Sequence, residues 1–378
     1  MNEIQRLIHE MCPDGVPMVA LGEVCEIKNG KDYKHLSPGN IPVWGTGGIM
    51  TYVDQYAYNG PSVLLPRKGS IDKVYYSEGP VWTVDTLFYT IINESKIKPK
   101  YLYAVISMQD LRALDTSKGN RPSLTQTVLN KIQIPLPPLP IQQRIVEILD
   151  KFTSLVSSLD SEIALRQKQY EYYRNKLLSF EEGFTTKKLK DITSKIASGA
   201  TPSGGDRAYK ESGISLIRSQ NVLDHSFSKE GLVFIDKEQA DKLSNVEIKE
   251  GDLLINITGD SVARACKVPS DLIPSRTNQH VAIIRINNDD IDSDFILYEL
   301  NSRKEELIQI ATANGGSRKA LSKGILEKLD IYFPPLPVQL SIVRTLDTFE
   351  SLLTNLKKER ELRQKQYEYY REKLLTFA

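Results

Sequence analysis

Cysteine and histidine are scarce in this chain of 378 residues. The three cysteines, Cys12, Cys25 and Cys266, are too few and too scattered for a disulfide framework or a zinc site. The four histidines have no metal-ligand spacing either. Long apolar runs are also missing, and the N-terminus lacks the basic and then apolar pattern of an export signal. The sequence therefore predicts a cytoplasmic protein without a metal site.

An excess of charge of one sign is missing as well. The 49 basic residues balance 48 acidic ones, which leaves a formal net charge of +1. A nucleic-acid binder usually carries a basic patch, and no long segment here is basic. Any role in binding DNA must therefore depend on a few locally clustered residues.

Recognisable catalytic motifs are also missing. The sequence contains no Walker loop, no [DNS]PP[YFW] methyltransferase motif, no HExxH and no nucleophile elbow. The carboxylates form no recognisable catalytic pair. These absences predict that the chain is not an enzyme.

What the sequence does contain is a long internal repeat. Residues 137–180 return as residues 334–377, 197 positions later, with 28 of 44 positions identical. A repeat of this length fixes how the other segments relate to one another. It divides the chain into segments 1–136, 137–182, 183–333 and 334–378, of which the second and fourth are the repeated ones.

Each copy of the repeat predicts one long helix. PPLP precedes each helix, and no Gly or Pro interrupts residues 141–180 or 338–377. Each helix would be roughly 60 Å long. Apolar residues mark a heptad seam with one stutter in the first copy: Ile145, Ile148, Phe152, Leu155, Leu159, Ile163, Tyr170, Tyr173, Leu177 and Phe180. The second copy places Ile342, Phe349, Leu352, Leu356, Tyr367, Tyr370, Leu374 and Phe377 on the same seam.

Connectivity predicts that the two helices run antiparallel. If residues 183–333 form one compact domain, the end of the first helix and the start of the second lie side by side. The C-terminus then returns to the N-terminus, where residues 1–12 stand in for a last helical turn. We expect a first half that is a circular permutation of the second, with pseudo-twofold symmetry.

The segments outside the repeat predict two similar α/β domains with mostly antiparallel sheets. LGEVCEIKNG, IPVWGTGG, LLPRKGSIDKV and GPVWTVDTLFYTII match, in order, KLKDITSKIASG, GISLIRSQNV, GDLLINITGDSVARACKV and SRTNQHVAIIRI. Residues 101–114 read as a helix with a counterpart from residue 295. The GTGG stretch lacks P-loop spacing, so a plain turn is the better interpretation.

The order of these segments resembles the specificity (S) subunit of type I restriction-modification systems. The resemblance rests on two unlike domains, each followed by a helix that PPLPxQ introduces and RQKQYEYYRxKLLxF closes, and on the MCPDGVP, GTGG, RKGS and GSRKxLS stretches. It implies two target recognition domains that each read half of a bipartite, asymmetric site on double-stranded DNA. The helices would form an antiparallel coiled coil that spaces the domains.

The resemblance also implies partners. Two modification subunits would dock on the chain and methylate adenine with S-adenosylmethionine, and restriction subunits would add ATP and magnesium. No cofactor is expected on this chain itself. Two other classes remain open: a coiled-coil scaffold whose domains bind proteins, and an enzyme acting on nucleic acid, which the missing motifs disfavour.

Candidate DNA-contacting side chains are those of the types that read bases or hold phosphates. An exposed Arg-Lys pair is usually only solvated surface, so residue type alone does not assign them. The candidates are Arg67, Lys68, Lys73, Trp82, Arg121, Arg218, Gln220, Asn221, Arg276, Asn278, Gln279, His280, Ser317, Arg318 and Lys319. The RTNQH stretch, which holds Arg276 to His280, is the richest cluster.

Overall fold

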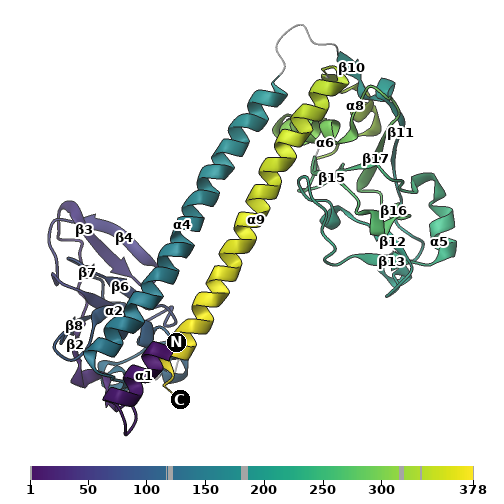
Figure 1. The fold of residues 1–378 in the computed structure, drawn as a ribbon. Coiled ribbons are helices and arrows are strands. Elements are labelled where there is room, and N and C mark those ends of the chain that lie inside the picture. Colours follow the sequence, from purple (N-terminus) through teal and green to yellow (C-terminus); the bar gives the residue numbers. More distant parts are fainter. Residues whose placement is uncertain are drawn as a thin grey trace. The chain divides into compact units, whose positions relative to one another are not determined.

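The chain divides into two compact units. The structure is a computed structural model that describes residues 2–115, 117, 122–179, 186–314, 319–332 and 334–377. Unit 1 contains Met1–Ser161 and Lys357–Ala378, and unit 2 contains Glu162–Leu356. Both boundaries fall inside long helices, so each unit has one part of each helix beside its own sheets (Figure 1).

Three small sheets form the domain of unit 1. Four antiparallel strands run in the order β2 (Cys25–Asn29), β8 (Leu87–Ile92), β5 (Ser62–Pro66) and β6 (Tyr75–Ser77). A second sheet has the order β4 (Gly48–Val53), β3 (Pro38–Gly45) and β7 (Trp82–Thr83), in which β3 and β7 are parallel. The pair β1 (Met18–Ala20) and β9 (Gln133–Pro135) joins the ends of the domain.

Unit 2 repeats this topology strand for strand. Its four-stranded sheet runs β11 (Thr193–Ser198), β17 (Val281–Ile286), β14 (Leu253–Asn256) and β15 (Ala265–Lys267). Its second sheet runs β13 (Val233–Ile235), β12 (Ile214–Ile217) and β16 (Arg276–Thr277), again with one parallel pair, and β10 (Thr186–Lys188) pairs with β18 (Asp330–Tyr332). The predicted α/β class, with two similar and mostly antiparallel domains, is confirmed.

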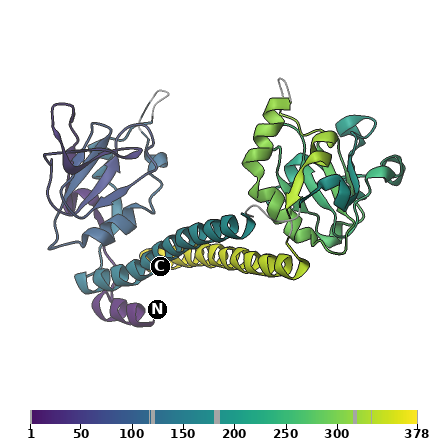
Figure 2. The same ribbon diagram turned by 90° about the horizontal axis from the view of Figure 1, so that it is seen from above.

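Each unit also contains shorter helices. Unit 1 has α1 (Asn2–Met11), α2 (Pro99–Ile106) and α3 (Gln126–Leu129), and unit 2 has α5 (Lys237–Lys242), α6 (Ser293–Ser302), α7 (Lys304–Asn314) and α8 (Lys323–Lys328). Figure 2 shows α6 and α7 in bright green at one side of their own domain. The predicted helix over 101–114 is wrong in extent: it ends at Ile106, and Asp110 caps a separate 3₁₀ turn, Leu111–Leu114.

The repeat forms helices α4 (Leu139–Leu178) and α9 (Leu336–Leu375). In unit 1 the ring of Phe152 stacks on Tyr370, and Asp160 pairs with Arg360. In unit 2 Tyr170 donates to Glu350. Numbers rise along α4 while they fall along α9, so the helices run antiparallel in each unit, as predicted.

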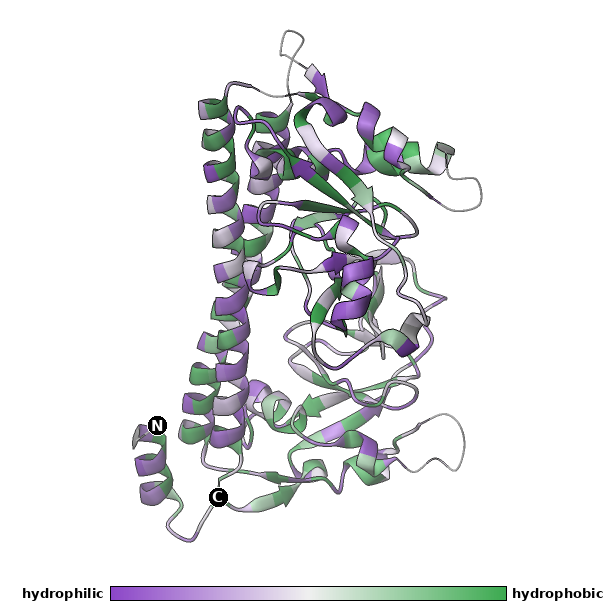
Figure 3. Ribbon diagram, turned by 90° about the vertical axis from the view of Figure 1, so that its right-hand side faces the viewer, coloured by the Kyte–Doolittle hydropathy of each residue, from purple (hydrophilic) through white to green (hydrophobic). Residues whose placement is uncertain are grey.

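The buried seam differs in detail from the predicted one. It passes through Val156 and Leu353, whereas Leu155 and Leu352 are 49% and 38% exposed. Steps of four and three then continue without the predicted stutter, through residues 145, 149, 152, 156, 159, 163, 166 and 170. Either Leu155 or Val156, and either Leu352 or Leu353, could lie on the seam of a helix. Only packing against the other helix selects which of the two is buried. Figure 3 shows the resulting mixture of polar and apolar residues along both helices.

Residues 1–12, expected to stand in for a last helical turn, contain the separate helix α1, with Ile4 buried in the same cluster as Leu374 and Leu375. Glu3 accepts from Arg144 of α4 at 2.7 Å. The two ends of the chain therefore meet within unit 1, as connectivity predicts (Figure 1).

None of the helices in the described part of the chain combines the length and hydrophobicity that a membrane crossing needs.

Candidate nucleic-acid interface

A cleft in unit 2 gathers several of the predicted side chains. The strands β12 and β16 are parallel, so the loops that follow them emerge at the same edge, beside the loop after β14. A cavity of about 750 Å³ lies there. It is lined by Ser219, Gln220, Thr258, Gly259, Asp260, Ser261, Arg264, His280, Lys319 and Ala320.

Hydrogen bonds fix the orientation of the side chains at this cleft. Thr201 donates to Gln279 Oε1 at 2.6 Å, and Gln279 Nε2 lies 3.0 Å from His280 Nε2. His280 Nδ1 lies 2.6 Å from the hydroxyl of Thr258. The two ring nitrogens of His280 therefore link Gln279 to Thr258. Gln279 is exposed and His280 half-buried, so both stand at the surface in one set orientation.

Cationic groups at the cleft are few. Lys319 is exposed and Arg264 is half-exposed, while Asp260 places a carboxylate among them. Arg264 and Asp260 are absent from the predicted set. A signal for them was present in the match between GDLLINITGDSVARACKV and LLPRKGSIDKV, because the charged loop of the first domain, with Lys68 and Lys73, predicts a polar loop after β14 as well.

Two residues of unit 2 that were predicted to contact DNA instead hold the fold together. Arg276 is 4% exposed, and its guanidinium donates to Ala240 O, Ser275 O and Glu247 Oε2. Asn221 is fully buried: its amide donates to Ser228 O and Glu230 O, and its oxygen accepts from the Arg218 backbone. Their hydrogen-bonding groups serve the fold, so neither remains a candidate for reading bases.

The side chains of the remaining candidates near this edge already make some hydrogen bonds within the chain. Asn278 is buried and its oxygen accepts from the His280 backbone. Arg218 donates to Gly231 O at 2.6 Å and lies over the ring of Tyr209, and Gln220 also reaches Gly231 O, at 3.2 Å. Of the RTNQH stretch, only Gln279 and His280 therefore present side chains at the surface.

Unit 1 builds the corresponding loop in the same way. Gly69 donates its backbone N–H to Pro122 O, as Gly259 does to Lys319 O. Both glycines have positive φ, 87° and 78°, which other residues rarely adopt. Lys68 thereby takes the position of Thr258 and is exposed.

The other candidates of unit 1 differ in accessibility. Lys73 is exposed, and Arg67 is half-buried, donating to Asp85 O at 3.2 Å. Trp82 is 7% exposed, belongs to a small apolar core with Val43, and donates to Lys31 O. It cannot stack on a base from this position, so we remove it from the candidates.

Three candidates, Arg121, Ser317 and Arg318, lie outside the described residues. Within the part that the structure describes, no group of three or more His, Cys, Asp or Glu side chains could hold a metal ion. The cysteines are free and buried, and burial raises the pKa of Cys25 and of Cys266 to about 12. Such thiols are poor nucleophiles and metal ligands.

Comparison with known proteins gives the family. A family model described as "Type I restriction modification DNA specificity domain" matches residues 13–165 and 181–364. A putative type I restriction enzyme specificity subunit of Haemophilus influenzae is 32% identical over 363 residues, which cover 90% of this chain and 89% of the relative. The EcoR124I/EcoR124II specificity subunit of Escherichia coli is 34% identical over 258 residues, covering 65% and 63%.

Solved structures share the fold. The crystal structure of a type I restriction-modification S subunit from M. genitalium aligns with a TM-score of 0.65 at 14% identity, covering 95% of this chain and 96% of that one. A chain from a structural study of the assembly of a type I R-M system aligns with a TM-score of 0.58 at 17% identity, covering 96% and 97%. The duplicated domains and helices, the family model and these relatives agree: the chain belongs to the type I restriction-modification DNA specificity family.

Proposed function

We propose that this chain is the specificity subunit of a type I restriction-modification complex and that each unit reads one half of a bipartite, asymmetric site on double-stranded DNA. The observation that carries the proposal is the strand order shared by the two units, with polar loops at the same strand ends in both. The relatives are named as specificity subunits, which favours this function over a scaffold that binds proteins.

The chemistry of the cleft in unit 2 suits base reading. A glutamine amide can pair with both N6 and N7 of adenine, and a lysine can contact guanine or a phosphate. Gln279 is held by Thr201 and His280 before DNA arrives, so little side-chain freedom is lost on binding. We assign base contacts to Gln279, His280 and Gln220, and a phosphate contact to Lys319.

In unit 1 we assign the matching role to the loop of Arg67, Lys68 and Lys73. Lys68 and Lys73 are exposed beside the loop that Gly69 shapes, which suits contact with phosphates. Arg67 is half-buried, and its guanidinium would have to leave Asp85 O to reach a base.

Catalysis and cofactors belong, in this proposal, to partner subunits. Two modification subunits bind S-adenosylmethionine and methylate adenine, and restriction subunits use ATP with magnesium. The sequence supports this division because it lacks the methyltransferase and nucleotide-binding motifs. With a net charge of +1, the chain alone would bind DNA weakly, and partners would supply many of the phosphate contacts.

The test is methylome sequencing of a host without other methyltransferases that expresses this chain with its modification subunits. We expect adenine methylation at one bipartite motif, and none from the pure chain alone. A relative's domain is then exchanged for residues 13–136 or, separately, for residues 183–333. Each exchange should alter one half of the motif. A motif that is not bipartite, or an exchange that changes both halves, would contradict the proposal.

A further inference from the structure

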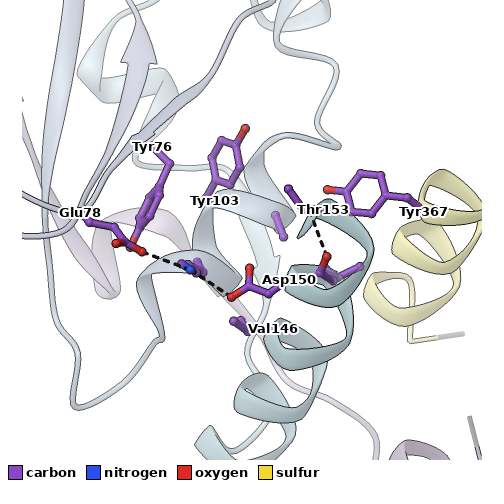
Figure 4. Close-up of a pocket in the computed structure, with 10 residues that line it drawn as sticks. Tyr76, Glu78, Tyr103, Val146, Asp150, Thr153 and Tyr367 are labelled. Carbon is purple, nitrogen blue, oxygen red and sulfur yellow. Dashed lines mark hydrogen bonds and ion pairs between the residues drawn. The ribbon is translucent and has the colours of Figure 1, made fainter. Parts of the chain in front are cut away.

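Unit 1 contains a pocket away from the candidate DNA-reading loops. Its volume is about 280 Å³, and it lies between α2, β6, the first half of α4 and the last turns of α9. The rings of Tyr76, Tyr103 and Tyr367 surround it (Figure 4). The small side chain of Ala104 also lines the pocket. Asp150 of α4 contributes a carboxylate.

The equivalent position in unit 2 can be identified through one pair of hydrogen bonds. Gln142 accepts from the backbone N–H of Lys98, the residue before α2, at 2.7 Å. Gln339, its counterpart in the repeat, accepts from Asp292, the residue before α6, at 2.9 Å. Counting six residues onward from each pairs Ala104 with Tyr298.

In unit 2 this space is filled. Tyr298 is 1% exposed, and its hydroxyl donates to Asp347 Oδ1 at 2.7 Å. Its ring stacks on His225 with centroids 4.1 Å apart, and His225 Nδ1 lies 3.0 Å from Glu350. Asp347 is the counterpart of Asp150 in the repeat. A phenol ring bonded to this carboxylate is therefore the group that completes the packing of unit 2.

Unit 1 has no counterpart of the two rings, Tyr298 and His225, that fill this space in unit 2. Ala104 offers no ring where unit 2 has Tyr298. His225 comes from residues 218–232, which connect β12 to β13, whereas only Thr46 and Gly47 separate β3 from β4. Asp150 retains a carboxylate oxygen for the missing hydroxyl, since its ion pair with Lys100 uses Oδ2, at 3.0 Å.

We propose that this pocket binds the side chain of a tyrosine presented by a protein partner, with the phenol hydroxyl donating to Asp150. The apolar, ring-lined interior and the charged rim of Lys100 and Glu78, 3.2 Å apart, have the layout of an interface anchor site. The volume lies below the roughly 300–1,000 Å³ of small-molecule sites, which suits a single side chain. The proposal does not depend on the function proposed above.

The test titrates the purified full chain with three probes followed by NMR. They are p-cresol, which is the tyrosine side chain cut at Cβ, toluene, which lacks the hydroxyl, and N-acetyl-L-tyrosinamide, which keeps the backbone. We expect one equivalent of p-cresol and of N-acetyl-L-tyrosinamide to bind, and toluene to bind about tenfold more weakly or worse, because it cannot bond to a carboxylate. Asp150→Asn should remove most of that preference for the hydroxyl.

Filling the pocket provides the control. Ala104→Tyr copies unit 2 and should abolish binding of all probes, and Val146→Phe fills the same space from α4 if the first variant does not fold. No binding of p-cresol to the wild type, or equal binding to a filled and folded variant, would overturn the proposal. Binding of p-cresol without N-acetyl-L-tyrosinamide would also overturn it, since the pocket would then take a free phenol and exclude a residue of a protein.

Discussion

Glu299 is buried beside Arg303, one turn further along α6–α7, with Oε1 3.4 Å from Nη1. The guanidinium is closer to the more exposed Glu306, at 2.8 Å. Burial therefore outweighs the ion pair and raises the pKa of Glu299 from 4.5 to about 7. Glu299 Oε2 has no hydrogen-bond partner among the described residues.

This shift predicts a fall in stability between about pH 4.5 and pH 7. In that window the folded chain keeps a proton on Glu299 that the unfolded chain releases, so a rise in pH favours unfolding. The expected loss in the free energy of unfolding is about 3 kcal/mol. Glu299→Gln should remove the decline and be more stable than the wild type above pH 7.

The measurement is urea unfolding at a series of pH values. Glu306→Gln is the control, because the same guanidinium lowers the pKa of Glu306, and the decline should persist in this variant. If Glu299→Gln keeps the full decline, another group causes it.

The buried glutamines of the repeat should matter for folding. Gln142 and Gln339 each donate to two carbonyls and accept from one backbone N–H, which ties the start of a long helix to the domain before it. Gln142→Ala leaves these groups unpaired and should cost about 1–3 kcal/mol. Gln143→Ala, at the exposed neighbour, should cost less than about 0.5 kcal/mol by denaturant unfolding. Equal losses would show that the buried hydrogen bonds contribute little.

Residues at the cleft in unit 2 should separate into two classes. In the complex with modification subunits, Gln279→Ala or His280→Ala should relax the preference at one base of one half-site, costing about 1–3 kcal/mol. Lys319→Ala should weaken binding to all sequences and reduce the slope of log K against log salt by about 1. Lys328→Ala, an exposed lysine that does not line the cleft, is the control for charge. Binding that is unchanged in all variants would make the cleft ordinary surface.

The helices should set the spacing of the two half-sites. Asp160 lies opposite Arg360, so one heptad inserted after Asp160 and one after Glu359 preserve the helix pairs on both sides. Each helix then gains about 10 Å, equal to roughly three base pairs of DNA. The methylated motif should keep its halves and lengthen its spacer by that amount.

A heptad in one helix only leaves seven residues without partners and should impair folding or assembly. If the double insertion is active with an unchanged spacer, the coiled coil does not determine the spacing.

Much of the fold could be predicted from the sequence because the chain contains a long internal repeat, so that its two halves can be compared. The repeat identified α4 and α9, connectivity gave their antiparallel direction, and segment matches paired β7 with β16 and β5 with β14. All of these follow from order along the chain, since a domain that begins where one helix ends and finishes where the next begins constrains both.

Which side chains are accessible was decided only by the tertiary structure. Arg276 and Trp82 have the residue types that contact DNA, but both are buried on the short strands β16 and β7. Val156 replaces Leu155 on the seam because packing selects between two apolar neighbours. The pocket at Ala104 is open because unit 1 has no ring at the position of Tyr298 and no counterpart of the loop that carries His225. Residue type and spacing do not contain this information, because burial depends on contacts between segments far apart in the sequence.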